Sequence, residues 1–275
     1  MDIKKILKDN NFRFNHSLGQ NFITDQNLLK DIVGKSGVTS DDIVVEIGTG
    51  AGTLTREIAS VAKKVVSFEL DRNLVKILDI TLAGLDNVEV VFKDVLKLSD
   101  KELQDIIGGK FKVVANLPYY VTSPLIMRFL ESTLQCESIT IMIQQEVANR
   151  LIATNNTADY GVITIAVNLY GDASIVLPVP KTYFYPMPKV DSAVVRIDVD
   201  RSKYQNVDKN ELLKLVKCGF QMRRKVLTNN LKNGYNLTKE QAEQVLEASG
   251  LELKVRGEAL SIENYITLLN NIKSL

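Results

Sequence analysis

Between residues 41 and 200, short runs of β-branched and aromatic residues alternate with amphipathic stretches. This alternation is typical of a parallel sheet that is covered by helices. The candidate strands are Ile43–Ile47, Val65–Leu70, Val88–Phe92, Phe111–Ala115, Ile139–Ile143, Ala173–Val179 and Ala193–Val199. The first of these runs lack polar alternation, as expected of strands buried on both faces. We therefore predict an α/β fold with a Rossmann-like sheet of seven strands.

The pattern changes after Asp200, because no strand-like run follows and the apolar spacing predicts helices. Two of these helices begin at capping boxes, Thr238 with Gln241 and Ser261 with Asn264. A chain of 275 residues has room for one full α/β domain and a smaller appendage. We predict an N-terminal arm and first helix over residues 1–40, the sheet domain over 41–200 and a small all-helical domain over 201–275.

The composition excludes several classes of protein. No stretch approaches the roughly 18 uninterrupted apolar residues of a membrane span, and the N-terminus lacks the apolar segment of a secretion signal. We therefore expect a cytoplasmic protein without a membrane partner. The two cysteines and the single histidine are too few for a Cys/His zinc site, so we expect no metal. Any catalysis must proceed without clusters of imidazole or thiolate groups.

The formal net charge of +1 conceals an uneven distribution along the chain. Residues 1–40 carry 6 basic and 4 acidic side chains, residues 41–200 carry 15 and 21, and residues 201–275 carry 13 and 8. An acidic middle between basic ends is compatible with ends that meet a polyanion such as nucleic acid, although many proteins that bind none share it.

A glycine-rich turn follows the first predicted strand, where Glu46-Ile47-Gly48-Thr49-Gly50-Ala51-Gly52 leads into a helix. Glycines let the backbone turn tightly and approach a ligand, and a helix N-terminus offers unpaired N–H groups. The dinucleotide fingerprint is Gly-x-Gly-x-x-Gly, whereas this turn has Gly-x-Gly-x-Gly after an acidic residue. The order resembles motif I of S-adenosylmethionine-dependent methyltransferases, with Gly48 and Gly50 as candidate cofactor contacts.

Acidic residues close the next two predicted strands. Glu69 ends the second strand and could accept hydrogen bonds from ribose hydroxyls, and Asp94 ends the third and could accept one from an adenine amine. Carboxyl ends of strands are where open α/β sheets bind ligands. These features together favour an adenosyl cofactor, although an acid at Glu69 also fits a nicotinamide cofactor.

The fourth predicted strand ends in Asn116-Leu117-Pro118-Tyr119, which resembles motif IV of amino-methyltransferases. An exocyclic amine is a poor nucleophile because its lone pair is delocalised into the ring. If the Asn116 side-chain oxygen and the Leu117 carbonyl accept its two hydrogens, the lone pair becomes free to attack a methyl group. Tyr119 would then stack on a base that has left its helix.

Taken together, these motifs make the chain resemble the small-subunit ribosomal RNA adenine dimethyltransferases, the KsgA or RsmA family, over nearly its whole length. The matching blocks are His16 to Ile23, Glu46 to Gly52, Asn116 to Tyr119 and, in a proline-rich loop, Phe184 to Val195. The resemblance implies S-adenosylmethionine as cofactor and a Rossmann-like methyltransferase sheet with the arm folded over it. It also implies cofactor contacts at Asn21, Ile23, Gly48, Glu69, Asp94 and Asn116. Phe184 is expected to stack on the target adenine opposite Tyr119.

The resemblance implies dimethylation of two adjacent adenosines near the 3′ end of small-subunit ribosomal RNA during ribosome biogenesis. The partner would be that RNA or an immature small subunit, and we expect a monomer. Arg223, Arg224 and Lys225 are predicted phosphate contacts of the basic tail.

Three alternatives remain open. An Erm-type resistance enzyme would modify large-subunit RNA, but the block from Phe184 and the basic run from Arg223 argue against it. A ribosome-assembly factor would act by binding rather than by methylation. A nicotinamide oxidoreductase is the weakest alternative, because it leaves Asn116 to Tyr119 and the arm unexplained.

Overall fold

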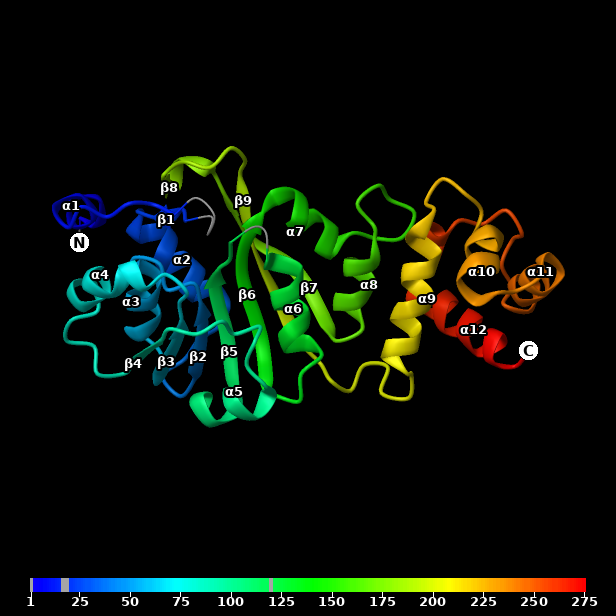
Figure 1. The fold of residues 1–275 in the computed structure, drawn as a ribbon, viewed down its shortest axis with the longest axis horizontal. Helices are drawn as coiled ribbons and strands as arrows, with labels where there is room; N and C mark the ends of the chain where they lie inside the picture. The colour runs from blue at the N-terminus through cyan, green and yellow to red at the C-terminus, as the bar shows by residue number, and fades with distance from the viewer. Residues whose placement is uncertain (1, 16–19, 119–120) are drawn as a thin grey trace. The chain divides into compact units, whose positions relative to one another are not determined.

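The computed structural model describes residues 2–15, 20–118 and 121–275, and the chain forms two compact units. One unit comprises Met1–Ala148 and Asp172–Val199, and the other comprises Asn149–Gly171 and Asp200–Leu275. Figure 1 shows the sheet and its flanking helices in the first unit and a group of helices in the second.

Seven strands form one sheet in the order β4-β3-β2-β5-β6-β9-β7. Their bounds are β2 Ile43–Ile47, β3 Lys64–Phe68, β4 Val88–Val91, β5 Phe111–Asn116, β6 Cys136–Gln144, β7 Gly171–Val179 and β9 Ser192–Val199. Strands β4, β3, β2, β5 and β6 are parallel to their neighbours, whereas β9 is antiparallel to β6. All seven predicted strands lie in this sheet, and the prediction of a Rossmann-like α/β fold is confirmed.

The helices of the first unit flank this sheet. They are α1 Ile3–Asp9, α2 Gln26–Ser36, α3 Thr53–Ala59, α4 Val75–Thr81, α5 Asp100–Ile107 and α6 Thr122–Leu130. Helix α7, Gln145–Ile152, begins in the first unit and ends in the second. Helix α2 begins where the Asp25 carboxylate accepts the N–H of Leu28 at 2.9 Å, which satisfies one of the unpaired donors of a helix start. Its Leu29 and Ile32 share a buried cluster with Val44 of β2. The helix is therefore held mainly by the apolar face that it turns toward the central strands.

A second, two-stranded sheet joins distant segments of the chain. Strand β1 (Phe22–Ile23) pairs antiparallel with β8 (Phe184–Tyr185), so that Ile23 lies opposite Phe184. The N–H of Thr24 extends the contact by donating to the Tyr183 carbonyl at 3.2 Å. The N-terminal arm is thus attached to the proline-rich loop, a pairing that no local pattern in the sequence predicted.

The second unit contains α8 Val162–Asn168, α9 Lys209–Gln221, α10 Leu227–Tyr235, α11 Lys239–Ala248 and α12 Ile262–Lys273. Both predicted capping boxes are present, at Thr238 and at Ser261. The segment Asn149–Gly171 was placed within residues 41–200 by the sequence, and in the structure it groups with these helices. Its Tyr160 hydroxyl donates to the Leu260 carbonyl at 2.9 Å, one of the bonds that hold it there.

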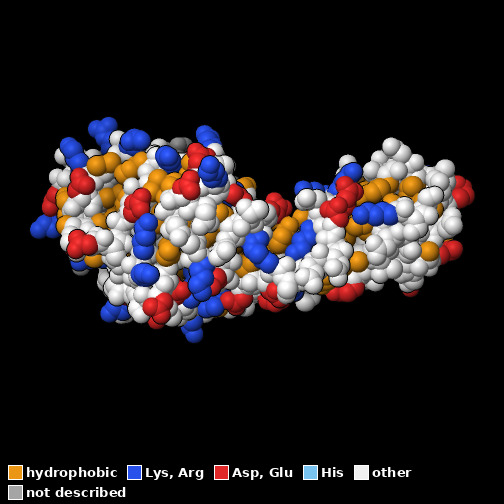
Figure 2. Space-filling model, turned by 90° about the horizontal axis from the view of Figure 1, so that it is seen from below, with side chains coloured by type: hydrophobic (Ala, Val, Ile, Leu, Met, Phe, Trp, Pro, Cys, Tyr) orange, Lys and Arg blue, Asp and Glu red, His pale blue; other side chains and the backbone are white. Residues whose placement is uncertain are grey.

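Charged side chains of both signs are intermixed on the face that Figure 2 shows, in keeping with a net charge of +1. Within the part of the chain that the structure describes, no helix is both long and apolar enough to cross a membrane.

Candidate active site

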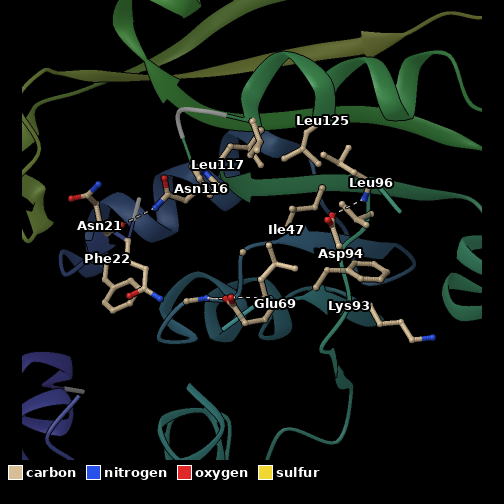
Figure 3. A pocket seen from close by; sticks show the side chains of 18 residues that line it. Asn21, Phe22, Ile47, Glu69, Lys93, Asp94, Leu96, Asn116, Leu117 and Leu125 are labelled. Carbon is tan, nitrogen blue, oxygen red and sulfur yellow. Dashed lines mark hydrogen bonds between the residues drawn. The ribbon is translucent and has the colours of Figure 1, made fainter. Parts of the chain in front are cut away.

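A pocket lies at the carboxyl ends of the parallel strands (Figure 3). Strand β2 has β3 on one side and β5 on the other, so the chain changes direction across the sheet there. Such a switch point leaves a crevice in which open α/β sheets bind ligands. The predicted residues that line the pocket are Asn21, Gly48, Gly50, Glu69, Asp94, Asn116, Leu117 and Pro118.

The glycine-rich turn between β2 and α3 forms one side of the pocket. Gly48 has φ +81°, a conformation that L side chains rarely adopt, and its N–H donates to the Phe68 carbonyl at 2.8 Å. Gly52 has φ +77°, and a Cβ there would lie 2.8 Å from Thr81 Oγ1. The third glycine therefore allows close packing against α4, while the first allows the turn that leads into the pocket.

Glu69 holds three backbone donors at the end of β3. Its Oε2 accepts the N–H of Gly50 at 2.8 Å, and its Oε1 accepts those of Leu70 and Asp71 at 2.7 and 2.8 Å. Burial raises the pKa of the Glu69 carboxyl. The three backbone donors favour the charged form and oppose this shift, but they do not cancel it. A carboxylate has about four acceptor positions, so acceptor capacity remains on Oε2 for a hydroxyl in the pocket.

Asp94 supplies a second carboxylate, beyond the end of β4. Its Oδ1 accepts the N–H of Leu96 at 3.1 Å, which orients the side chain at the pocket (Figure 3). The apolar side chains of Leu70 and Leu96 also line the pocket and are 50% and 37% exposed. Two exposed leucines beside a carboxylate form a slot that can hold a flat, hydrogen-bonding ring.

The amide of Asn116 is oriented by the N-terminal arm. Its Nδ2 donates to the backbone carbonyl of Asn21 at 3.1 Å, as Figure 3 shows. With the nitrogen held in this way, Oδ1 is the atom left to accept a hydrogen from a ligand. The peptide between Asn116 and Leu117 is fixed as well, because the Leu117 N–H donates to the Met142 carbonyl of β6 at 3.2 Å.

Other predicted site residues do not line this pocket. Ile23 is 2% exposed and Phe184 is 5% exposed, and both belong to the buried cluster beneath α2. Tyr119 lies outside the described residues, as do His16 to Gly19. Arg223, Arg224 and Lys225 lie in the second unit, between α9 and α10.

The sequence analysis did not single out several residues that line the pocket. Gln20 precedes β1, and its Nε2 donates to Asp71 Oδ2 at 2.7 Å. Phe22 lies against the glycine-rich turn, because its Cε1 would be 3.0 Å from a Cβ added at Gly50. In the sequence, the signal for Gln20 and Phe22 was that they flank Asn21, which was predicted to contact the cofactor. Val121 and Leu125 complete the apolar wall from the start of α6.

Glu46 lies beneath the glycine-rich turn and is 1% exposed. Its Oε2 accepts the hydroxyls of Thr55 at 2.5 Å and Ser67 at 2.6 Å, and Ser67 also shares a hydrogen bond with Thr49. Burial raises the pKa of the Glu46 carboxyl from its ordinary 4.5 to about 8, although the two hydroxyls oppose the shift. The network ties β2, β3 and α3 together under the pocket.

This carboxyl predicts a pH dependence of stability. Because the folded pKa lies above the unfolded one, the folded state keeps a proton that the unfolded state has lost between pH 4.5 and about 8. The free energy of unfolding then falls with rising pH, by up to about 1.4 kcal/mol per pH unit in this window. Glu46→Gln should remove this contribution, as measured by urea unfolding of both proteins across the window. Glu89→Gln, at a half-exposed position of β4, is the control. An unchanged difference between wild type and Glu46→Gln at all pH values would contradict the assignment.

Among the described residues, no group of three or more histidine, cysteine, aspartate or glutamate side chains is arranged to hold a metal ion.

Comparisons with known proteins cover both units. The sequence profile of a family described as ribosomal RNA adenine dimethylase matches residues 11–272. A protein of Alkaliphilus metalliredigens named ribosomal RNA small subunit methyltransferase A is 48% identical, over 98% of this chain and 95% of its own. A protein of Clostridioides difficile with the same name is 43% identical, over 98% and 95%.

Two solved structures are similar over most of the chain. A dimethyladenosine transferase from Plasmodium falciparum has a TM-score of 0.78 at 25% identity, covering 92% of this chain and 98% of that chain. The 23S rRNA methyltransferase ErmE has a TM-score of 0.69 at 26% identity, covering 92% and 99%.

Proposed function

We propose, because this chain belongs to the ribosomal RNA adenine dimethylase family, that it methylates two adjacent adenosines near the 3′ end of small-subunit ribosomal RNA. The chain is an rRNA adenine dimethyltransferase. The methyl donor we propose is S-adenosylmethionine. The proposal for the small subunit is supported by the name of the relatives that are 43% and 48% identical.

The orientation of Asn116 is the observation that carries the chemical part of the proposal. Its Nδ2 is engaged by the Asn21 carbonyl, and its Oδ1 remains at the pocket. The target amine is a weak nucleophile while its lone pair is shared with the ring. Asn116 Oδ1 and the Leu117 carbonyl accept its hydrogens and so localise the lone pair on nitrogen. Because the Asn116 amide is oriented before the RNA arrives, little reorganisation of this acceptor is needed during the reaction.

The pocket residues fit an adenosyl cofactor. The remaining acceptor capacity of Glu69 Oε2 suits a ribose hydroxyl, and the Asp94 carboxylate suits an adenine amine. Leu70 and Leu96 offer apolar surface for the ring, and Gly48 leaves room beside it. When bound, S-adenosylmethionine supplies an electrophilic methyl group. Asn21, Gly48, Gly50, Glu69, Asp94 and Asn116 would hold it.

Aromatic stacking on the target adenine by Tyr119 and Phe184 stays part of the proposal. Phe184 is buried in the structure, on β8 opposite Ile23. Its role would require the loop that follows β7 to expose the ring when the RNA is bound. Ile23 would contribute through its backbone, because its side chain is buried.

The experiment that tests this function is the transfer of labelled methyl groups to unmethylated small subunits, large subunits and their naked RNAs. Nuclease digestion then identifies the labelled nucleoside. Dimethyladenosine on small-subunit RNA supports the proposal, and on large-subunit RNA it would indicate an Erm-type enzyme. No label anywhere, with cofactor binding intact, would indicate a factor that acts by binding alone.

The basic run between α9 and α10 is proposed to contact RNA phosphates. Arg223 is also structural, because its Nε donates to Glu258 Oε2 at 3.1 Å and one Nη donates to the carbonyls of Ala158 and Tyr160. Arg224 and Lys225 are exposed.

Replacing both exposed residues with alanine should therefore weaken RNA binding without loss of stability. Each lost phosphate contact should also reduce the slope of log K against log salt by about 0.7 to 0.9. Filter binding at several salt concentrations measures both effects. An unchanged slope would remove Arg224 and Lys225 from the RNA interface.

A further inference from the structure

A second cavity lies in the first unit and shares no lining residue with the pocket. Its volume is about 410 Å³, and its lining includes Gln144, Glu146, Lys181, Lys189 and Asp191. One water molecule occupies about 30 Å³ in the liquid. The cavity therefore has room for a ligand much larger than a bridging water.

The register of the sheet places this cavity close to the Asn116 amide. Asn116 of β5 lies opposite Met142 of β6, and Gln144 follows two residues further along β6. At ordinary strand dimensions, Gln144 is then about 6.6 Å along the sheet and about 4.8 Å across it from Asn116. The pocket lies at the carboxyl ends of β2, β3, β4 and β5, and the cavity lies where β6 ends and β9 begins. Asn116, on β5, therefore lies on the side of the pocket that is nearer to the cavity.

The cavity combines cationic groups with an amide. Neither Lys181 nor Lys189 forms an ion pair with any residue in the described ranges, so both ammonium groups can bind an anion. Gln144 is partly buried, and its amide makes no hydrogen bond to another described residue. Asp191 is occupied within the loop, where its Oδ1 accepts the backbone N–H of Lys181 at 2.9 Å.

These groups match a nucleotide better than they match a simple anion. Ammonium groups bind phosphate oxygens, and a glutamine amide pairs with the N6 and N7 edge of adenine. The carboxylates of Glu146 and Asp191 offset the two lysines, which disfavours a small anion with several charges and leaves room for one phosphate with a neutral base. Val190 and Met187 add apolar side chains that are 45% and 61% exposed on the same loop, suited to the face of a base.

We propose that this cavity binds the nucleotide next to the adenosine that is being methylated, an inference that rests on the proposed function. Lys181 and Lys189 hold the backbone phosphate, and Gln144 reads the base edge. With the neighbour seated there, the unpaired strand is held in a register that places one amine at Asn116. The cavity thereby supplies a positioning subsite for a substrate with two adjacent adenosines.

The first test compares Lys181→Ala/Lys189→Ala with a control of equal charge change, Lys30→Ala/Lys63→Ala. Lys30 lies on α2 and Lys63 precedes β3 at the amino end of the strands, and both are exposed. We expect KM for unmethylated small subunits to rise about tenfold in the cavity variant alone. Its affinity for S-adenosylmethionine should stay at the wild-type value. Equal KM values for the cavity variant and the control would overturn the proposal.

The second test asks whether the cavity reads a base. Small subunits are reconstituted with RNA in which the nucleotide beside the target has no base. We expect this change to raise KM for the wild-type protein but not to raise it further for Gln144→Ala, because both remove the same contact. Additive effects would overturn the role of Gln144. Failure of the wild-type protein to methylate any RNA would instead contradict the proposed function.

Discussion

Replacing Asn116 with alanine should lower kcat for methyl transfer to small-subunit RNA by about 10²- to 10³-fold. The side-chain Oδ1 is the acceptor that localises the lone pair of the target amine, and its orientation is set by the hydrogen bond from Nδ2 to the Asn21 carbonyl. Alanine removes the acceptor, and a water molecule that replaces it is not held in place. Single-turnover methylation with saturating RNA and cofactor measures the effect directly.

Asn87→Ala is the matched control for this variant. The Asn87 amide also donates to backbone carbonyls, those of Ala59 and Ala62 at 2.9 and 3.0 Å, but at the amino end of β4. We expect it to lower the free energy of unfolding by about 1 kcal/mol for each lost hydrogen bond and to leave kcat unchanged. If Asn116→Ala kept kcat within about tenfold of wild type, or about 1.4 kcal/mol, the amide would not be a principal catalytic group.

Replacing Glu69 with alanine should weaken cofactor binding while RNA binding persists. The loss of one charge-assisted hydrogen bond to a ribose hydroxyl corresponds to about 1.5 to 3 kcal/mol, or about ten- to 100-fold in affinity. The loss of the acceptor for Gly50, Leu70 and Asp71 also loosens the glycine-rich turn. Titration calorimetry with S-adenosylmethionine and filter binding with RNA separate the two affinities.

Glu89→Ala is the control for loss of a carboxylate, because Glu89 forms a half-exposed ion pair with Lys64, and such a pair contributes little to stability. We expect wild-type cofactor affinity for this control. Wild-type cofactor affinity in Glu69→Ala would remove Glu69 from the binding site. In cells, Glu69→Ala also tests the alternative that the protein acts on subunit assembly by binding rather than by methylation. Normal subunit assembly with this variant, together with defective assembly in a deletion strain, would make RNA binding the principal role.

The sheet and most of the pocket could be predicted because they depend on local patterns. Each buried strand is a short apolar run, and each parallel strand places its last residue at the same edge. Glu69, Asp94 and Asn116 follow the ends of three such runs and therefore converge on the pocket. The two capping boxes of the second unit were predicted for the same reason, because a capping box is read from four consecutive residues.

Contacts between distant segments could not be predicted in this way. The pairing of Ile23 with Phe184 joins two-residue strands that are too short to have a period of their own. It buries both side chains, so that neither Ile23 nor Phe184 lines the pocket despite the resemblance. The placement of Asn149–Gly171 with the C-terminal helices depends equally on distant partners, such as the Leu260 carbonyl that binds Tyr160.

By itself, the sequence determined the seven strands, the glycine-rich turn and the polar residues at the strand ends, because these follow from residue size, hydrophobic period and backbone freedom over a few neighbours. Only the tertiary structure decided which atom of Asn116 faces the pocket, which side chains of the arm and loop are buried, and where a second cavity opens beside the motif. Those features depend on contacts between distant segments, such as that of Phe22 with Tyr185. The free energy of such contacts must exceed the entropy of closing the chain between them, and only the whole fold sets that balance.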